Sequence, residues 1–170
     1  MNGFNVELDL QGAAELSRLW DTAPDITREE LLSAVTEIDL MIEAEVKENT
    51  PVGVGGGGGL RGSIFSQEES LANNVLGVVG TSQPYAIAVE LGTEPHFPPV
   101  EPLKDWVRQK LDVEASEVDH VAFLVARKIA SKGTEGKFMF SNAMKEKRAE
   151  AVQRFDHAVQ RVRDRLAGGR

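Results

Sequence analysis

Apolar residues recur along this chain with two different periods, and each period predicts an element. Residues 4–10 alternate between apolar and polar at every position, which is the pattern of a half-buried strand. From residue 27 to about residue 48, apolar residues recur at three- and four-residue steps, which predicts a helix with one apolar stripe. The stripe consists of Leu31, Val35, Ile38, Ile42 and Val46.

Local signals predict where this helix begins and ends. Thr27 and Glu30 have the spacing of a capping box, in which each side chain satisfies a free backbone N–H of the first turn, so we expect the helix to begin there. Pro51 should end it, because the residue before a proline disfavours helical geometry. A shorter helical segment should precede the long helix and end near Pro24.

The middle of the chain predicts a loop, a hairpin and a short helix. Residues 53–59 are six glycines and one valine, so we expect a mobile loop there. Residues 60–67 and 75–81 read as two strands joined by a loop over 68–74. Residues 84–91 should form a short helix that packs on the sheet through its larger apolar side chains, Tyr85, Ile87 or Ala88, and Leu91.

The second half of the chain is mostly helical by pattern. Prolines between residues 95 and 102 predict a stiff connector, and Pro102 suits the first turn of a helix. A further helix over about 116–131 has apolar residues around most of its circumference, so it should be largely buried, and Gly133 suits its C-terminal cap. The last helix should begin near Ser141. Its apolar stripe is Met144, Val152, Phe155, Val159, Val162 and Leu166.

Together these elements predict an α+β fold in one domain over residues 1–170. A small antiparallel sheet of three to four strands should pack against the long helix. A helical insertion over about 94–137 and a long C-terminal helix over about 141–167 complete this prediction.

Composition and charge exclude several classes of protein. The chain has 170 residues with 41% hydrophobic and 27% charged residues, an ordinary composition for a soluble globular protein. No run approaches the roughly 18 apolar residues of a membrane span, and no signal stretch opens the chain, so we expect no membrane association. The absence of cysteine excludes disulfides and thiol chemistry.

The net charge of −8 argues against general nucleic-acid binding, and its distribution is uneven. Residues 127–170 contain 12 Lys and Arg against 5 Asp and Glu, whereas the first 126 residues contain 7 against 22. This polarity could serve head-to-tail contact between identical subunits, or it could be a solvated basic helix face. Both readings stay open at this stage.

Candidate catalytic and cofactor motifs do not survive inspection of their context. Residues 53–58 fit the dinucleotide pattern G-x-G-x-x-G, but a helix precedes them and a strand follows, the reverse of what that motif requires. His96, His120 and His157 have no partners at the spacing of a metal site or a catalytic triad. We therefore expect no enzyme and no cofactor. A rival enzyme class, such as a phage lysin or a nuclease, would need clustered carboxylates or a metal site.

Glu90 is a carboxylate within an apolar stretch, and such a group usually has a fixed partner because unpaired burial of charge is costly. The partner could be backbone N–H groups, Arg61, or a neighbouring subunit. We hypothesise that the charged ends of Arg61 and Glu90 lie within about 4 Å of each other.

Three motifs occur in order along the chain. The first runs from Thr50-Pro51-Val52 through the glycine run to Gly59-Leu60-Arg61-Gly62-Ser63-Ile64, the second is Pro84 to Thr93, and the third is Phe138 to Ala143. In this order they resemble the neck or tail-completion proteins of long-tailed bacteriophages. That family reads "Pro-x-x-Thr-Gly-x-Leu-Arg-x-Ser-Ile", then "Tyr-Ala-x-x-Val-Glu-x-Gly-Thr", then "Pro-Phe-Leu-x-Pro-Ala". The glycine loop and the insertion over 94–137 depart from the family pattern.

The resemblance implies a structural protein of the virion that joins the capsid connector to the tail, made in the host cytoplasm. It implies a homo-oligomeric ring, a hexamer as first choice and a dodecamer as second. The ring would contact a connector or head-closure protein and a tail terminator or tail tube protein, and would enclose DNA without sequence-specific binding. The structural and interface residues carried by the motifs are Pro51, Leu60, Arg61, Ser63, Ile64, Tyr85, Glu90, Gly92, Thr93, Phe138 and Phe140.

The alternative is a small DNA-binding or regulatory module that uses the basic C-terminal helix. It predicts a salt-sensitive affinity for duplex DNA that disappears when the arginines of this helix are neutralised. These are Arg154, Arg161, Arg163 and Arg165.

Overall fold

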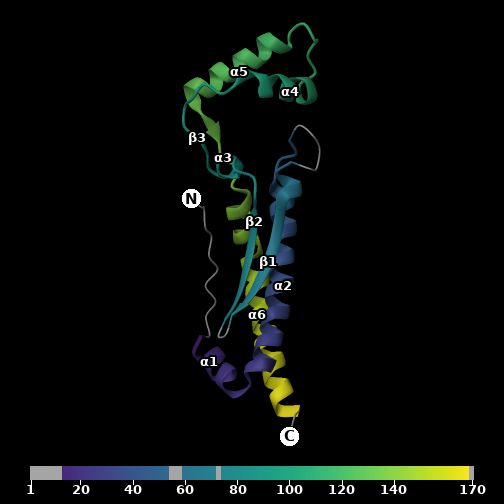
Figure 1. Cartoon of the computed structure of the whole chain (residues 1–170), viewed down its shortest axis with the longest axis vertical. Helices are drawn as coiled ribbons and strands as arrows, with labels where there is room; N and C mark the ends of the chain where they lie inside the picture. The colour runs from purple at the N-terminus through teal and green to yellow at the C-terminus, as the bar shows by residue number, and fades with distance from the viewer. Residues whose placement is uncertain (1–12, 54–58, 72–73, 169–170) are drawn as a thin grey trace. The chain divides into compact units, whose positions relative to one another are not determined.

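The computed structural model describes residues 13–53, 59–71 and 74–168, which belong to two compact units (Figure 1). The described part of the motif unit is residues 50–53, 59–63 and 82–139, and that of the hairpin unit is 13–49, 64–71, 74–81 and 140–168. We describe each unit by itself, and the single domain stays a prediction. The strand expected over 4–10 and most of the glycine loop lie outside the described residues.

The hairpin unit is an antiparallel β-hairpin packed on a long helix. Strands β1 (Ile64–Leu71) and β2 (Asn74–Thr81) pair along their whole length, from Ile64 opposite Thr81 to Leu71 opposite Asn74. Both strands contact helix α2 (Pro24–Asn49), and α1 (Ala13–Thr22) packs against the same helix. The loop expected over 68–74 was therefore predicted too long. The first strand begins at Ile64, because residues Arg61–Ser63 form a 3₁₀ turn instead of an extended segment.

Helix α2 confirms the predicted stripe but not the predicted start. Leu31, Ile38, Ile42 and Val46 are buried, and Val35 is half-buried. The helix begins at Pro24, whose ring suits a first helical turn, so the capping box was wrong. Thr27 instead donates its hydroxyl to the carbonyl oxygen of Leu19 at 3.0 Å, which ties α2 to α1.

Asp39 is a buried carboxylate of α2 that the apolar stripe did not reveal. Its side chain is 6% exposed and lies against Gly77 of β2, where any Cβ would clash with the carboxylate. The backbone N–H of Val78 bonds to it, but Oδ2 has no hydrogen-bond partner among the described residues. Burial first, and then the charge of Glu68, raises the pKa of Asp39 to about 6.

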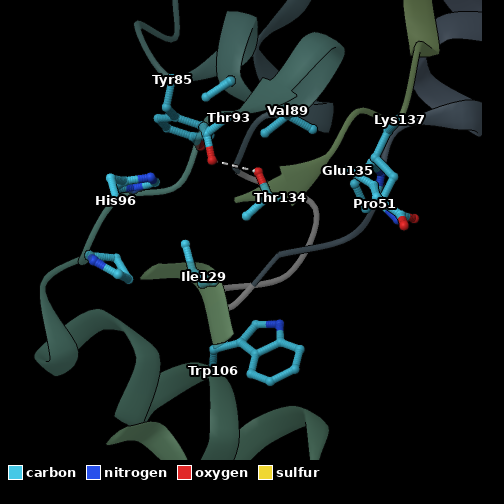
Figure 2. Close-up of a pocket in the computed structure, with 12 residues that line it drawn as sticks. Pro51, Tyr85, Val89, Thr93, His96, Trp106, Ile129, Thr134, Glu135 and Lys137 are labelled. Atoms are coloured by element: carbon cyan, nitrogen blue, oxygen red, sulfur yellow. Dashed lines mark hydrogen bonds between the residues drawn. The ribbon is translucent and has the colours of Figure 1, made fainter. Parts of the chain in front are cut away.

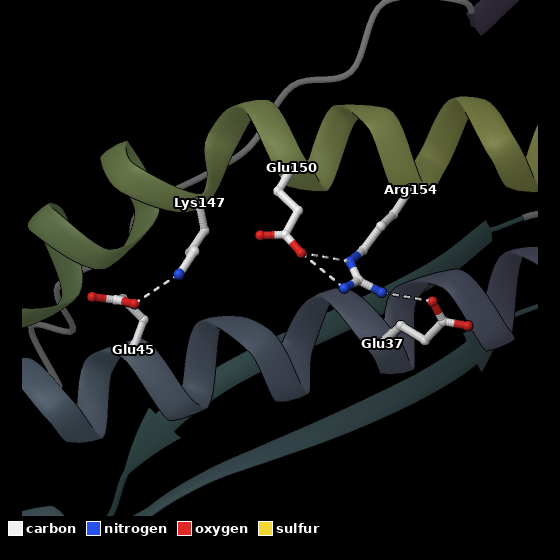
Figure 3. Close-up of polar contacts among 5 residues, drawn as sticks. All are labelled: Glu37, Glu45, Lys147, Glu150 and Arg154. Carbon is white, nitrogen blue, oxygen red and sulfur yellow. Dashed lines mark hydrogen bonds and ion pairs between the residues drawn. The ribbon is translucent and has the colours of Figure 1, made fainter.

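The long C-terminal helix α6 (Met139–Gly168) is joined to α2 by ion pairs (Figure 3). Lys147 lies 2.9 Å from the carboxylate of Glu45. Arg154 lies 2.8 Å from Glu150 on its own helix and 2.9 Å from Glu37 on α2. The positive charge of α6 is therefore partly compensated within the unit.

Further along α6, two more arginines contact the first turns of α2. Arg161 lies 2.6 Å from Glu30, and Arg165 lies 2.9 Å from both Glu29 and Glu30. The hydrogen bond from Arg161 is the main cause that lowers the pKa of Glu30 below its ordinary value. In the predicted stripe of α6 only Val162 is fully buried. The other buried positions of α6 within this unit are the alanines Ala143, Ala151 and Ala158.

The motif unit contains short elements and one helical pair. Its elements are α3 (Ala86–Leu91), β3 (Gly92–Thr93), α4 (Val100–Lys110), α5 (Val118–Lys132) and β4 (Thr134–Glu135). Helices α4 and α5 pack around Val107, Val118 and Ala122. Gly133 caps α5 with a φ of 70°, as predicted.

Helix α5 is not largely buried, contrary to the prediction. Val118, Ala122 and Ala126 form its buried face, whereas Phe123 is 46% and Leu124 is 42% exposed. The apolar residues that surround this helix exceed what the neighbouring helix α4 covers.

The α+β class and the long C-terminal helix are confirmed. In the described part of the chain the strands form two separate two-stranded antiparallel sheets, β1–β2 and β3–β4, instead of one sheet of three to four strands. Within the same residues, no helix combines the length and the apolar character needed to cross a membrane.

Candidate functional site

Nine of the eleven motif residues lie in the motif unit, although they come from three distant parts of the chain. The other two lie in the hairpin unit, where Ile64 is buried at the start of β1 and Phe140 is half-buried on α6. The sequence motifs thus contribute mainly to one unit. We take that unit as the candidate site.

The second and third motifs are joined by backbone hydrogen bonds. The N–H of Lys137 donates to the carbonyl oxygen of Val89 at 2.8 Å, and the N–H of Phe138 donates to that of Glu90 at 3.0 Å. Next to these bonds β3 pairs with β4, and the hydroxyls of Thr93 and Thr134 lie 2.9 Å apart (Figure 2). Residues separated by more than forty positions therefore form one small structure.

Gly92 of the second motif has a backbone reason to be glycine. Its φ is 80°, in the left-handed region, and a Cβ at this position would collide with the carbonyl oxygen of Thr134. A Cβ at Gly136 on the opposite segment would meet the carbonyl oxygen of Glu90 at 2.5 Å, which is also too close. The two segments can approach this closely only because neither position carries a side chain.

The first motif meets the third in the buried part of the unit. The hydroxyl of Thr50 contacts Sδ of Met139 at 3.2 Å, and both side chains are buried. After the glycine loop, Leu60 is buried and its carbonyl oxygen accepts a hydrogen bond from the hydroxyl of Ser63 at 2.8 Å. These contacts give structural roles to Leu60 and Ser63, whereas Pro51 is exposed.

Phe138 combines an unusual backbone with an exposed ring. Its φ is 50°, which makes it the one non-glycine residue with positive φ among those described. A residue with a Cβ is strained in this region by about 1–2 kcal/mol. Its ring is nevertheless 46% exposed, so packing of the side chain does not repay the strain within the chain.

The prediction that Glu90 is a buried carboxylate with a partner is confirmed. Glu90 is 2% exposed, so it is a buried carboxylate, and it has interaction partners, as Arg61 does. Their pairing with each other stays a prediction.

Helix α3 presents a different face from the one predicted. Ala86 and Glu90, four residues apart, form its buried side. The larger apolar residues expected to pack on the sheet are exposed instead. We use the name motif patch for four exposed apolar residues of the second and third motifs, Tyr85, Ile87, Leu91 and Phe138, each between 43% and 48% exposed. At about 100° per residue Ile87 and Leu91 share one side of α3, whereas Tyr85, at the N-cap, lies on another side. The sequence signal for this orientation was the pair of Ala86 and Glu90 at helical spacing.

Beside the motif patch lies an open, mainly apolar groove of about 440 Å³ (Figure 2). Tyr85 and Thr93 line it from the second motif, Trp106 from α4 and Ile129 from α5. His96 lies at its side and bonds through Nδ1 to the carbonyl oxygen of Glu94 at 2.9 Å. The sequence did not single out Trp106 and Ile129 as groove residues.

The chemistry of this surface suits contact with another apolar surface. Covering exposed apolar area is worth about 25 cal/mol per Å², so a partner that fits the patch and the groove would bind favourably. Across the described ranges, no group of three or more His, Asp or Glu side chains could hold a metal ion.

No protein-family model, curated protein or solved structure matches this chain.

Proposed function

We propose that this chain is a structural protein of a tailed-phage virion, which forms a ring in the neck or tail-completion layer and joins the capsid connector to the tail. The observation that carries this proposal is that the whole second motif, all of the described first motif except Ile64, and the start of the third motif lie in one unit, with the motif patch exposed on them. The motifs that resemble the phage family are thus joined by direct contacts, and they leave apolar side chains uncovered.

The proposed partners follow from this surface. A head-to-tail contact between copies generates a closed ring when the rotation between neighbours closes. The motif patch of one copy would be covered by its neighbour, in a hexamer as first choice and a dodecamer as second. The connector or head-closure protein and the tail terminator or tail tube protein would bind the two sides of the ring, with DNA passing through it.

The experiment is assembly of the purified chain, alone and mixed with the connector and tail-tube proteins of the same phage. Native mass spectrometry and negative-stain electron microscopy should show a ring. The double variant Tyr85→Ser/Leu91→Ser should lose the ring while keeping its circular dichroism spectrum.

The matched control is Leu40→Ser, which changes a similarly exposed apolar residue on α2, outside the motifs. It should leave the ring intact. A chain that stays monomeric in every mixture would overturn the proposal, and so would a ring unaffected by the double variant.

A further inference from the structure

Helix α5 exposes one face whose chemistry changes along its length from acidic through apolar to basic. We define the α5 stripe as Glu117, Asp119, Phe123, Leu124, Arg127 and Lys128, all of them exposed. Most of it lies opposite the buried face of Val118, Ala122 and Ala126, and Asp119 borders that face, where it pairs with Lys104 of α4. Figure 1 shows α5 beside α4, which covers that buried face.

The spacing along the α5 stripe is symmetric. Asp119, Phe123 and Arg127 follow one another at four-residue steps, so they lie on one side of the helix. His120, Leu124 and Lys128 form a second row beside them with the same step, which ends in a basic residue but begins with a histidine instead of an acid. The acidic end and the basic end are therefore equally far from the apolar centre, about 6 Å along the axis in each direction.

The charges at the two ends are largely available to a partner. In the described part of the chain Glu117, Arg127 and Lys128 form no ion pair, and Asp119 contacts only Lys104, at 3.1 Å. Phe97, in the proline-rich segment before α4, widens the apolar centre. Its ring centroid lies 6.3 Å from that of Phe123.

We propose that a second copy of this chain binds to the α5 stripe, with the two α5 helices antiparallel about a two-fold axis near Phe123 and Leu124. In this arrangement the acidic end of each stripe faces the basic end of the other. A parallel arrangement would instead place like charges opposite each other. Such self-complementarity is the requirement for a contact in which both copies use the same surface.

This contact does not depend on the proposed ring. Helix α5 lies between the second and third motifs, and none of its stripe residues belongs to a motif or to the motif patch. The two proposals can therefore fail separately.

The absence of cysteine in the natural sequence allows a clean cross-linking test. Leu124→Cys places one thiol close to the two-fold axis, so that the thiols of two copies meet there. We expect a disulfide-linked dimer under mild oxidation. Leu40→Cys, at a more exposed site on α2, is the matched control and should cross-link at least about tenfold more slowly.

Charge reversal tests the complementarity. Glu117→Lys/Asp119→Lys and Arg127→Glu/Lys128→Glu should each weaken the dimer by about tenfold or more, as measured by sedimentation equilibrium. An equimolar mixture of the two variants should restore the dimer, because an all-basic stripe then faces an all-acidic one. Restoration would also show that both variants are folded.

Three outcomes would overturn the two-fold contact. They are a wild-type chain that is monomeric, a Leu124→Cys variant that cross-links no faster than Leu40→Cys, and a mixture of the two charge variants that stays monomeric. A head-to-tail contact through the same charges would pass the mixing test but fail the cysteine test, and so would also overturn it. Tyr85→Ser/Leu91→Ser should leave the α5 cross-link unchanged, which separates this result from a failure of the proposed ring.

Discussion

The carboxylate of Asp39 on α2 lies directly against Gly77 on β2, in a space that only a residue without a side chain leaves open. Glu68, opposite Gly77 on β1, adds a second negative charge nearby. The contact between the hairpin and α2 therefore contains a buried acid that forms no ion pair among the described residues.

Asp39→Asn should stabilise the protein above neutral pH and have little effect in acid. The pKa of Asp39 is raised from 3.8 to about 6 in the folded chain, so stability falls as the pH rises from about 4 to 6 and stays lower above that range. The amide removes this loss, which is about 3 kcal/mol from the size of the shift. Urea unfolding near pH 8 and near pH 3 measures it. An equal effect at both values would contradict the ionisation argument.

Gly77→Ala should destabilise the hairpin by about 1–3 kcal/mol, because the new methyl group collides with Asp39. The double variant Gly77→Ala/Asp39→Ala should lose less than the sum of its two single variants, since the collision is gone. Gly80→Ala on the same strand is the control, because a Cβ there meets its nearest neighbour, Phe65, at an ordinary 3.8 Å. Thermal unfolding of the four variants measures these losses of stability. If the losses of the two single variants simply add in the double variant, Gly77 and Asp39 are not in contact.

Phe138→Asn should separate stability from assembly. Asparagine tolerates the left-handed region better than phenylalanine, so the melting temperature should be maintained or raised relative to Phe138→Ala. Loss of the exposed aromatic side chain should weaken assembly of the proposed ring of subunits in both variants. Calorimetry and native mass spectrometry measure the two effects. A melting temperature for Phe138→Asn below that of Phe138→Ala would show that the backbone at residue 138 is not strained.

The pair of Glu30 and Arg161 should contribute several tenths of a kcal/mol, up to about 1 kcal/mol, to stability, as measured by a double-mutant cycle with Glu30→Gln and Arg161→Gln. Because the pKa of Glu30 is lowered, this contribution is present above its ordinary value of about 4.5 and is lost as the pH falls through the folded value. A coupling that persists in strong acid would show that charge is not its source.

The same arginine tests the DNA-binding alternative. Arg161→Gln should lower the melting temperature without changing the affinity for duplex DNA, since Arg161 already contacts Glu30. A loss of salt-sensitive DNA binding in this variant, measured by fluorescence anisotropy at two ionic strengths, would favour the alternative over the ring.

The spacing of apolar residues predicted the helices and strands that bury one face. It did not predict the contacts between segments far apart in the sequence. The stripe from Leu31 to Val46 and the cap at Gly133 depend on neighbours in sequence, and both were predicted correctly. Asp39 was missed because its burial depends on a glycine 38 positions away. The capping box at Thr27 failed because Pro24 provides an earlier start.

The sequence named the motif residues but not their geometry. Nine of the eleven lie in one unit, and their role in contacts with a partner stays a prediction. The exposed face of α3 was missed because a short apolar helix does not reveal from its own residues which side is covered. The buried carboxylate of Glu90, four residues from Ala86, was the available clue.

The backbone bonds from Lys137 and Phe138 to Val89 and Glu90 also set an order of events during protein synthesis. The ribosome makes α3 long before it makes the segment that completes the surface around it. A nascent chain therefore displays Tyr85 and Leu91 without Phe138, and the full patch exists only once most of the polypeptide has emerged. Translation itself would thus delay the proposed self-association through the motif patch until a subunit is nearly finished.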